Sequence, residues 1–215
     1  MKCRNFAFKT TIFIKFQEYF MDMNKPAEMP CQNKRFNDVL DVFLSVAKAL
    51  IIIFILLTFV LSVCTVVGSS MDNTLHNGEK LLLINGHFSI KENDIIVFHQ
   101  TGYINEPVVK RVIATGNKYV KIDYDNCITY VSDDAIFDKS DIIDESGYAY
   151  FDTGSYKMKG TLEIYVPQGY LFVLGDNRNN STDSRSDLIG LVDERTVLGK
   201  VIFRFSPADK IGFIK

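Results

Sequence analysis

The sequence predicts a mainly β domain, antiparallel and either barrel-like or sandwich-like, preceded by one N-terminal transmembrane α-helix. Two observations support this prediction. An apolar run at residues 49–67 contains no charged residue, proline or glycine. After it the pattern changes to short runs rich in β-branched and aromatic residues, bounded by Asn, Gly, Asp or Pro, which is typical of antiparallel strands and turns.

Residues 49–67 are long enough to cross a bilayer, because a helix of this length covers roughly 30 Å. A buried core helix is less favoured, since it would normally have a polar face, and this run offers only Thr58, Ser62 and Cys64. A cleaved secretory signal is disfavoured by the length of the run and its distance from the N-terminus.

Charge is distributed unevenly around this run. The chain has 24 Lys and Arg against 26 Asp and Glu, a net charge of -2, which argues against an extensive nucleic-acid-binding surface. Lys34 and Arg35 precede the apolar run. The positive-inside rule therefore places residues 1–48 in the cytoplasm, residues 49–67 in the membrane and residues 68–215 outside the cytoplasm.

Two interpretations of residues 1–35 stay open. Their aromatic and basic side chains are typical of a membrane-surface segment. Alternatively, translation begins at a later methionine, such as Met21 or Met23. No functional prediction depends on this segment.

Eight strands are expected after the helix. Their bounds are Glu79–Ile84, Asp94–His99, Val108–Ala114, Tyr119–Ile122, Cys127–Val131, Leu162–Val166, Tyr170–Leu174 and Val197–Arg204. The acidic stretch Asp133–Ser146 is expected to be a solvated loop or insertion and not a metal site, because it lacks the glycine and ligand spacing of a calcium loop.

The four cysteines are expected to lie in different compartments. Cys3 and Cys31 fall on the cytoplasmic side, Cys64 in the membrane and Cys127 outside, so we expect no disulfide within the outer domain. Cys127 could be a thiol nucleophile like that of sortases, but its sequence surroundings (DYDNCITYV) favour a half-buried strand residue.

Ser70 is a candidate nucleophile at the membrane boundary. It belongs to GSSMDNTL, residues 68–75, which directly follows the apolar run. A nucleophile there would meet substrates that still lie in the bilayer. Considered alone, a serine in this position is more often a turn or capping residue, so the interpretation depends on finding a base.

A serine nucleophile needs a histidine, a carboxylate or a neutral lysine as its base. The histidines are His76, His87 and His99, and a Ser-His-Asp triad stays open. Lys110 and Arg111 are adjacent in an apolar strand (VVKRVIA), so one of them must face the core or a cleft. A buried lysine loses its proton readily, as a general base must; the alternative is an edge-strand lysine that discourages aggregation.

A third polar cluster, LGDNRNNSTDSR at residues 174–185, is denser than a turn requires. Together with GSSMDNTL, NDIIVF, VVKRVIA, GKVIFRFSP and the anchor, it makes the chain resemble the bacterial type I signal peptidases, membrane-bound Ser/Lys endopeptidases of the S26 group. The resemblance covers roughly residues 37–215. It implies the antiparallel, barrel-like catalytic domain of that family.

The resemblance also implies roles for individual residues. Ser70 would be the nucleophile, with its backbone N–H as an oxyanion donor, and Lys110 the general base, oriented by the hydroxyl of Ser181. The residues expected to hold the site together are Asp176, Asp183 and Arg185, the last two as an ion pair. Three positions depart from the family pattern: Gly68 lacks a hydroxyl that would be a second oxyanion donor, Asn73 replaces a proline, and Asn93 replaces a glycine.

The implied function is cleavage of N-terminal signal peptides from exported pre-proteins, after small residues, at the outer face of the membrane. The substrate would add as a β-strand between walls formed by residues 66–70 and 106–110. Signal peptides and membrane lipid are the expected partners, without nucleic acid, and no metal, nucleotide or other cofactor is needed. The alternatives are a repressor-type Ser/Lys autopeptidase, although no helix-turn-helix is evident, or a non-catalytic anchored surface protein.

Overall fold

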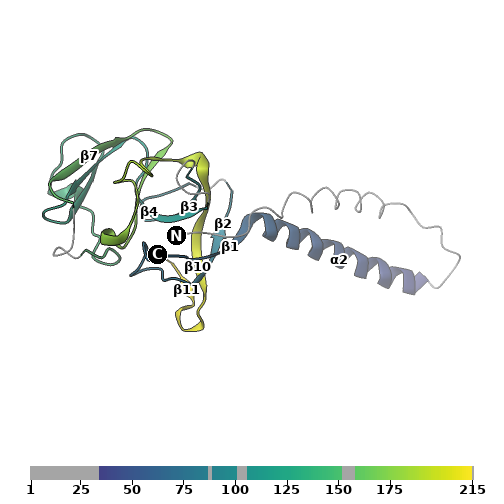
Figure 1. Ribbon diagram of the computed structural model, residues 1–215. Helices are drawn as coiled ribbons and strands as arrows, with labels where there is room; N and C mark the ends of the chain where they lie inside the picture. The colour runs from purple at the N-terminus through teal and green to yellow at the C-terminus, as the bar shows by residue number, and fades with distance from the viewer. Residues whose placement is uncertain (1–33, 87–88, 101–105, 152–157, 215) are drawn as a thin grey trace. The chain divides into compact units, whose positions relative to one another are not determined.

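The computed structural model describes residues 34–86, 89–100, 106–151 and 158–214. The chain divides into two compact units between Val60 and Leu61: a helix, α2 (Lys34–Val60), and a β domain (Figure 1). The predictions for residues 1–33, including Cys3, Cys31 and the two interpretations of the N-terminal segment, lie outside the described residues.

Helix α2 has the composition of a membrane span. An 18-residue stretch within Phe36–Val60 has a mean hydropathy of 2.7, and none of that stretch is buried. Two hydroxyls within the helix donate to backbone carbonyls one turn earlier, Ser45 to Asp41 at 2.8 Å and Thr58 to Phe54 at 2.7 Å. The helix therefore satisfies these polar groups internally, as a segment surrounded by lipid must.

The helix bounds correct the sequence prediction, which placed the helix at residues 49–67. The helix begins earlier, at Lys34, and ends at Val60. The next residues form strand β1 (Leu61–Thr65), which pairs antiparallel with β2 (Lys80–Ile84). Because the end of the helix and the strand are both apolar and uncharged, the hydropathy of the run does not reveal the junction between them.

Among the described residues, the main sheet of the β domain has eight strands. Besides β1 and β2 they are β3 (Ile95–Phe98), β4 (Val108–Ala114), β8 (Tyr170–Leu174), β9 (Val192–Asp193), β10 (Val197–Ser206) and β11 (Gly212–Phe213). Their order is β1-β2-β10-β3-β4-β8-β9, with β11 paired to β10 (Figure 1). Within the described ranges the pairing path does not return from β9 to β1, so the sheet is an open half barrel.

A smaller antiparallel sheet has the order β6-β5-β7. Its strands are β5 (Lys118–Asp123), β6 (Ile128–Ser132) and β7 (Thr161–Val166). Four short 3-10 helices complete the described structure: η1 (Lys139–Asp141), η2 (Arg178–Asn180), η3 (Glu194–Thr196) and η4 (Ala208–Lys210). The predicted fold class, mainly β with an antiparallel barrel-like domain and one N-terminal apolar helix, is confirmed, as are all eight predicted strands within one or two residues at each end.

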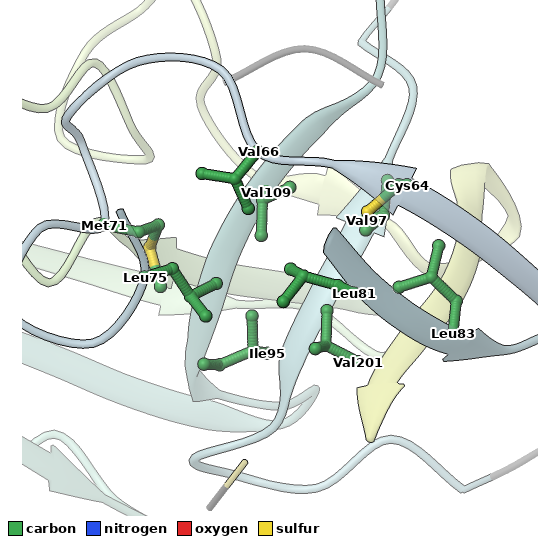
Figure 2. Packing of buried hydrophobic residues seen from close by; sticks show 10 residues of the cluster. All are labelled: Cys64, Val66, Met71, Leu75, Leu81, Leu83, Ile95, Val97, Val109 and Val201. Carbon is green, nitrogen blue, oxygen red and sulfur yellow. The ribbon is translucent and has the colours of Figure 1, made fainter. Parts of the chain in front are cut away.

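The core anchors the segment that carries Ser70. Met71 and Leu75 are fully buried, and Figure 2 shows their side chains directed toward Ile95 and Leu81. Strand β4 crosses the same region and is buried at every position. Apolar packing therefore fixes the backbone on both sides of the candidate site.

The prediction for Cys64 is wrong, whereas Cys127 is half-buried as predicted and lies one residue before the strand. Cys64 lies in β1 and not in the helix; it is buried, whereas its neighbour Val63 is 52% exposed, as the alternation of a strand requires. Cys127 lies in the turn before β6, with φ +55°, and its thiol donates to the carbonyl of Tyr124 at 3.7 Å. Burial raises the pKa of the Cys127 thiol, the opposite of what a thiol nucleophile needs.

Candidate active site

Ser70 lies at the start of a tight turn after β1. Asp72 N donates to Ser69 O at 3.1 Å, and Leu75 N donates to Met71 O at 2.8 Å. Since Met71 and Leu75 are buried, the turn is fixed to the core while Ser70 stays partly exposed. The sequence therefore places a partly exposed hydroxyl on a turn that is fixed to the core.

Lys110 faces Ser70. Its Nζ donates to Ser70 Oγ at 2.6 Å, although its side chain is almost completely buried, at 1% exposure. Strand β4 lies between β3 and β8, which rejects the edge-strand interpretation of this lysine. Burial lowers the pKa of Lys110 to about 8; Asp183 and Asp176 act to raise the pKa, and Arg185 acts to lower it.

Arg111 points to the opposite side of β4. Its Nε and Nη2 donate to the two carboxylate oxygens of Asp176 at 2.9 and 2.8 Å, and its Nη1 donates to Asn93 O at 2.9 Å. Thr74 donates a further hydrogen bond to Asp176 at 2.5 Å. Arg111 and Asp176 thus form a buried bidentate ion pair that joins β4 to the start of the 175–185 loop.

The predicted ion pair of Asp183 and Arg185 is present. Arg185 Nε and Nη2 donate to Asp183 at 2.7 and 2.8 Å, and Gly175 N donates to the same carboxylate at 3.0 Å. Burial alone would raise the pKa of Asp183, but these hydrogen bonds and the charge of Arg185 lower it overall. An ionised Asp183 is therefore held near Lys110.

Comparison with known proteins identifies the family of this arrangement. The family model for signal peptidase, peptidase S26, matches residues 39–206. Signal peptidase IB of Staphylococcus aureus (strain COL) is 34% identical over 79% of this chain and 91% of its own length. The chain belongs to the signal peptidase family, peptidase S26.

A further relative agrees with this assignment. Probable signal peptidase I-1 of Synechocystis sp. is 32% identical over 76% of this chain and 81% of its own length. The crystal structure of a signal peptidase I from Enterococcus faecalis V583 is 26% identical, with a TM-score of 0.38, covering 54% of this chain and 98% of that one. The chain is a membrane signal peptidase of the serine endopeptidase type, and neither the autopeptidase nor the non-catalytic alternative is favoured.

Ser181 of this signal peptidase lies beside the dyad without completing it. Its hydroxyl is buried and forms no hydrogen bond with any of the described residues. It lies close to Gly175 and near enough to Asp183 to help lower the pKa of that carboxylate, although the hydrogen-bond geometry is not met. The role of Ser181 in orienting Lys110 stays a prediction.

The three departures from the family pattern all have positive φ. Gly68 has φ +102°, Asn73 +95° and Asn93 +69°, and asparagine tolerates this region better than most residues with a side chain. Proline could not replace Asn73 in this backbone, because its ring fixes φ near -65°. The Asn73 amide instead donates to Tyr148 O at 2.9 Å.

Histidine is not the partner of Ser70 in the described part of the chain. His76 Nδ1 lies 3.6 Å from Glu79 Oε1, and the side chain that donates to Ser70 Oγ is that of Lys110. His87 lies outside the described residues. Across the described ranges, no group of three or more His, Cys, Asp or Glu side chains could hold a metal ion.

Sequence reasoning missed two ion-pairing residues near the site, Glu145 and Arg178. Arg178 belongs to the recognised 174–185 cluster but was assigned no role. Glu145 lies in the acidic stretch predicted to be solvated; most of this stretch is exposed, whereas the side chain of Glu145 is only 9% exposed. No local pattern distinguishes this carboxylate from its neighbours, because its partner is distant in sequence.

Proposed function

We propose that this signal peptidase removes N-terminal signal peptides from exported pre-proteins, with Ser70 as the nucleophile and Lys110 as the general base. The observation that carries the proposal is the 2.6 Å contact between Lys110 Nζ and Ser70 Oγ. With a pKa of about 8, about a tenth of the Lys110 side chains are neutral at pH 7. This fraction is sufficient for a base that is restored in each turnover.

The reaction follows from this contact. The neutral amine of Lys110 accepts the hydroxyl proton as Ser70 Oγ attacks the carbonyl carbon of the scissile bond. The backbone N–H of Ser70 donates to the oxyanion, and Lys110 then gives its proton to the leaving amine. Water, activated by the same lysine, hydrolyses the acyl-enzyme and frees the serine.

Substrate would bind in an extended form beside the Ser70 turn. Residues 66–70 and 106–110 would form its walls, and cleavage would follow small residues, as the family resemblance implies. Strand β1 ends the main sheet, where main-chain addition of a peptide is sterically simplest. Asp176, Asp183, Arg185 and Ser181 would support the dyad without touching the scissile bond.

Cleavage of a pre-protein by the detergent-solubilised enzyme tests these roles. We expect Ser70→Ala and Lys110→Arg each to abolish cleavage while the domain stays folded, because arginine keeps the charge but does not release its proton. Circular dichroism of each variant checks folding. Substantial turnover by Lys110→Arg would assign the base to another group.

The orientation in the membrane is also a proposal. It is supported by the basic residues that precede the span and by a family in which exported substrates are cut after translocation. We place residues before α2 in the cytoplasm, α2 in the membrane, and the domain from Leu61 on the outer side, where its surface also meets lipid headgroups.

Labelling of intact cells with a membrane-impermeant thiol reagent tests this topology. One variant carries Asp138→Cys with the four natural cysteines replaced, and a second keeps Cys31 alone. Asp138 lies in an exposed loop, so we expect labelling of the first variant and none of the second. The reverse pattern would overturn the topology.

A further inference from the structure

The segment between β6 and β7 reaches the loop that supports the dyad. Tyr150 N donates to Asp176 O at 2.8 Å, and Arg178 N donates to Tyr150 O at 3.0 Å. These bonds form a short parallel bridge between Tyr150 and Asn177. The residues 145–151, named here the clamp segment, are therefore attached along the 175–178 loop.

A buried ion pair strengthens this attachment. Arg178 Nη1 and Nη2 donate to the two carboxylate oxygens of Glu145 at 2.7 and 2.5 Å, and the side chains are 1% and 9% exposed. Thr129 in β6 donates to the same carboxylate at 2.9 Å. Glu145 is thus fixed by the smaller sheet, and its bidentate geometry fixes the Arg178 side chain.

Arg178 transmits this restraint to the backbone that touches Ser70. Its Nε donates to Gly175 O at 3.1 Å. A methyl group placed on Gly175 would come within 2.5 Å of Ser70 O, so the two backbones are in close contact. Asn177 N also donates to Ser70 O at 3.1 Å, and its side-chain amide donates to Ser69 O at 3.2 Å.

The clamp segment also contacts the nucleophile turn and the far side of β4. Asn73, three residues after Ser70, donates its amide to Tyr148 O. The guanidinium of Arg111 lies 4.0 Å from the centre of the Tyr148 ring, within range of a cation–π contact. Both backbone elements that carry the dyad, the turn and β4, are therefore in contact with residues of one segment.

We propose that Glu145 is a positioning residue for catalysis: by holding Arg178 it presses the 175–178 loop against the Ser70 carbonyl and so keeps Ser70 Oγ within reach of Lys110. The proposal rests on the dyad assignment given above. Glu145 touches neither Ser70 nor the scissile bond, and it acts through the loop.

The proposal predicts an effect that a loss of stability alone would not produce. The charged groups that act on Lys110 are Asp183, Arg185 and Asp176, and Glu145 is instead paired with Arg178. If the loop loosens, however, water reaches the Lys110 amine and the desolvation that lowers its pKa is relieved. The pKa then rises toward 10.5, the ordinary value for lysine.

Steady-state kinetics of the full-length, detergent-solubilised enzyme on a pre-protein substrate test this role. The variants are Glu145→Gln and a matched control, Glu163→Gln, which removes an exposed carboxylate of the smaller sheet paired with Lys121 at 2.7 Å. For Glu145→Gln we expect kcat to fall roughly ten- to a hundredfold, KM to stay within about twofold, and the acid limb of kcat/KM to move to higher pH. The control should match the wild type in all three quantities.

Thr129→Val is a second variant that tests the same role if Glu145→Gln does not fold. It removes one hydrogen bond to Glu145 and keeps the ion pair, so we expect a smaller loss of kcat, roughly two- to fivefold, with an acid-limb shift in the same direction. A wild-type kcat and acid limb in a folded Glu145→Gln, or in Thr129→Val when only that variant folds, would overturn the proposal. So would a loss of activity that matches the loss of folded enzyme with an unmoved acid limb.

Ser70→Ala in the same series separates a failure of the dyad assignment from a failure of the positioning role of Glu145. Cleavage by Ser70→Ala would overturn the dyad assignment and this proposal with it. An inactive Ser70→Ala together with an unaffected Glu145→Gln would overturn the positioning role alone.

Discussion

Lys110 and Arg111 are neighbours on β4, equally buried at 1% exposure, and they face opposite sides of the strand. Arg111 meets a carboxylate with two hydrogen bonds, whereas the Lys110 amine meets a serine hydroxyl. One side of the strand therefore compensates its buried charge and stabilises the fold. The other side leaves its charge poorly compensated, which is what the proposed role of Lys110 as the general base requires.

The two sides contribute differently to stability. Lowering the Lys110 pKa from 10.5 to about 8 costs about 3 kcal/mol of folding free energy wherever the lysine is protonated in both states, below about pH 8. Between about pH 8 and 10.5 the unfolded chain binds the extra proton, so this cost is relieved as the pH rises. The Arg111–Asp176 pair has the opposite character, because breaking it leaves a buried charge without a partner.

Of the substitutions that test the two sides of β4, Asp176→Asn is expected to have the largest effect. The substitution keeps the size of the side chain and removes the charge that compensates Arg111, so we expect the free energy of unfolding to fall by about 3–5 kcal/mol. Urea unfolding of the detergent-solubilised protein, followed by circular dichroism, measures this change. Lys110→Met is the matched variant on the other side, and it should raise stability at pH 7.

A loss below about 1 kcal/mol in Asp176→Asn would contradict the structural role of the pair. Destabilisation by Lys110→Met would show that the lysine is compensated after all, and that the two sides of β4 do not differ as described.

A smaller effect is expected from Ser181→Ala, which tests whether the Ser181 hydroxyl orients Lys110. If the hydroxyl accepts one amine hydrogen of Lys110 during turnover, its loss removes a hydrogen bond worth about 1–3 kcal/mol. The variant should then cleave a pre-protein roughly ten- to a hundredfold more slowly, while staying far above Ser70→Ala. Wild-type activity would exclude Ser181 from the orientation of the base, and activity as low as Ser70→Ala would indicate a different role.

Much of the fold could be predicted because its strands have clear boundaries in the sequence. Strands β4 and β8 were predicted to the residue, since Pro107 precedes the first and glycines flank the second. The two-residue strands β9 and β11 carry no periodic pattern and were missed. The helix end was also missed, because the apolar composition continues from α2 into β1.

The site residues that lie in recognisable motifs could be predicted from the sequence. Those that only folding brings to the site could not. The motifs indicated Ser70 and Lys110, and the alternation of the strand required Lys110 and Arg111 to face opposite sides without saying which one faces the serine. Glu145 lies 33 residues from its partner Arg178, in a stretch of similar carboxylates. Only the packing of the smaller sheet selects it.

The pH dependence of kcat/KM between pH 6 and 10 tests the central claim, that a buried lysine with a lowered pKa is the base. For the wild type on a pre-protein substrate, log kcat/KM should rise with unit slope in acid and level off near pH 8, the pKa of about 8 for Lys110, because kcat/KM reports the free enzyme. An acid limb near pH 6.5, the ordinary pKa of histidine, or a rate independent of pH across this range would contradict the account.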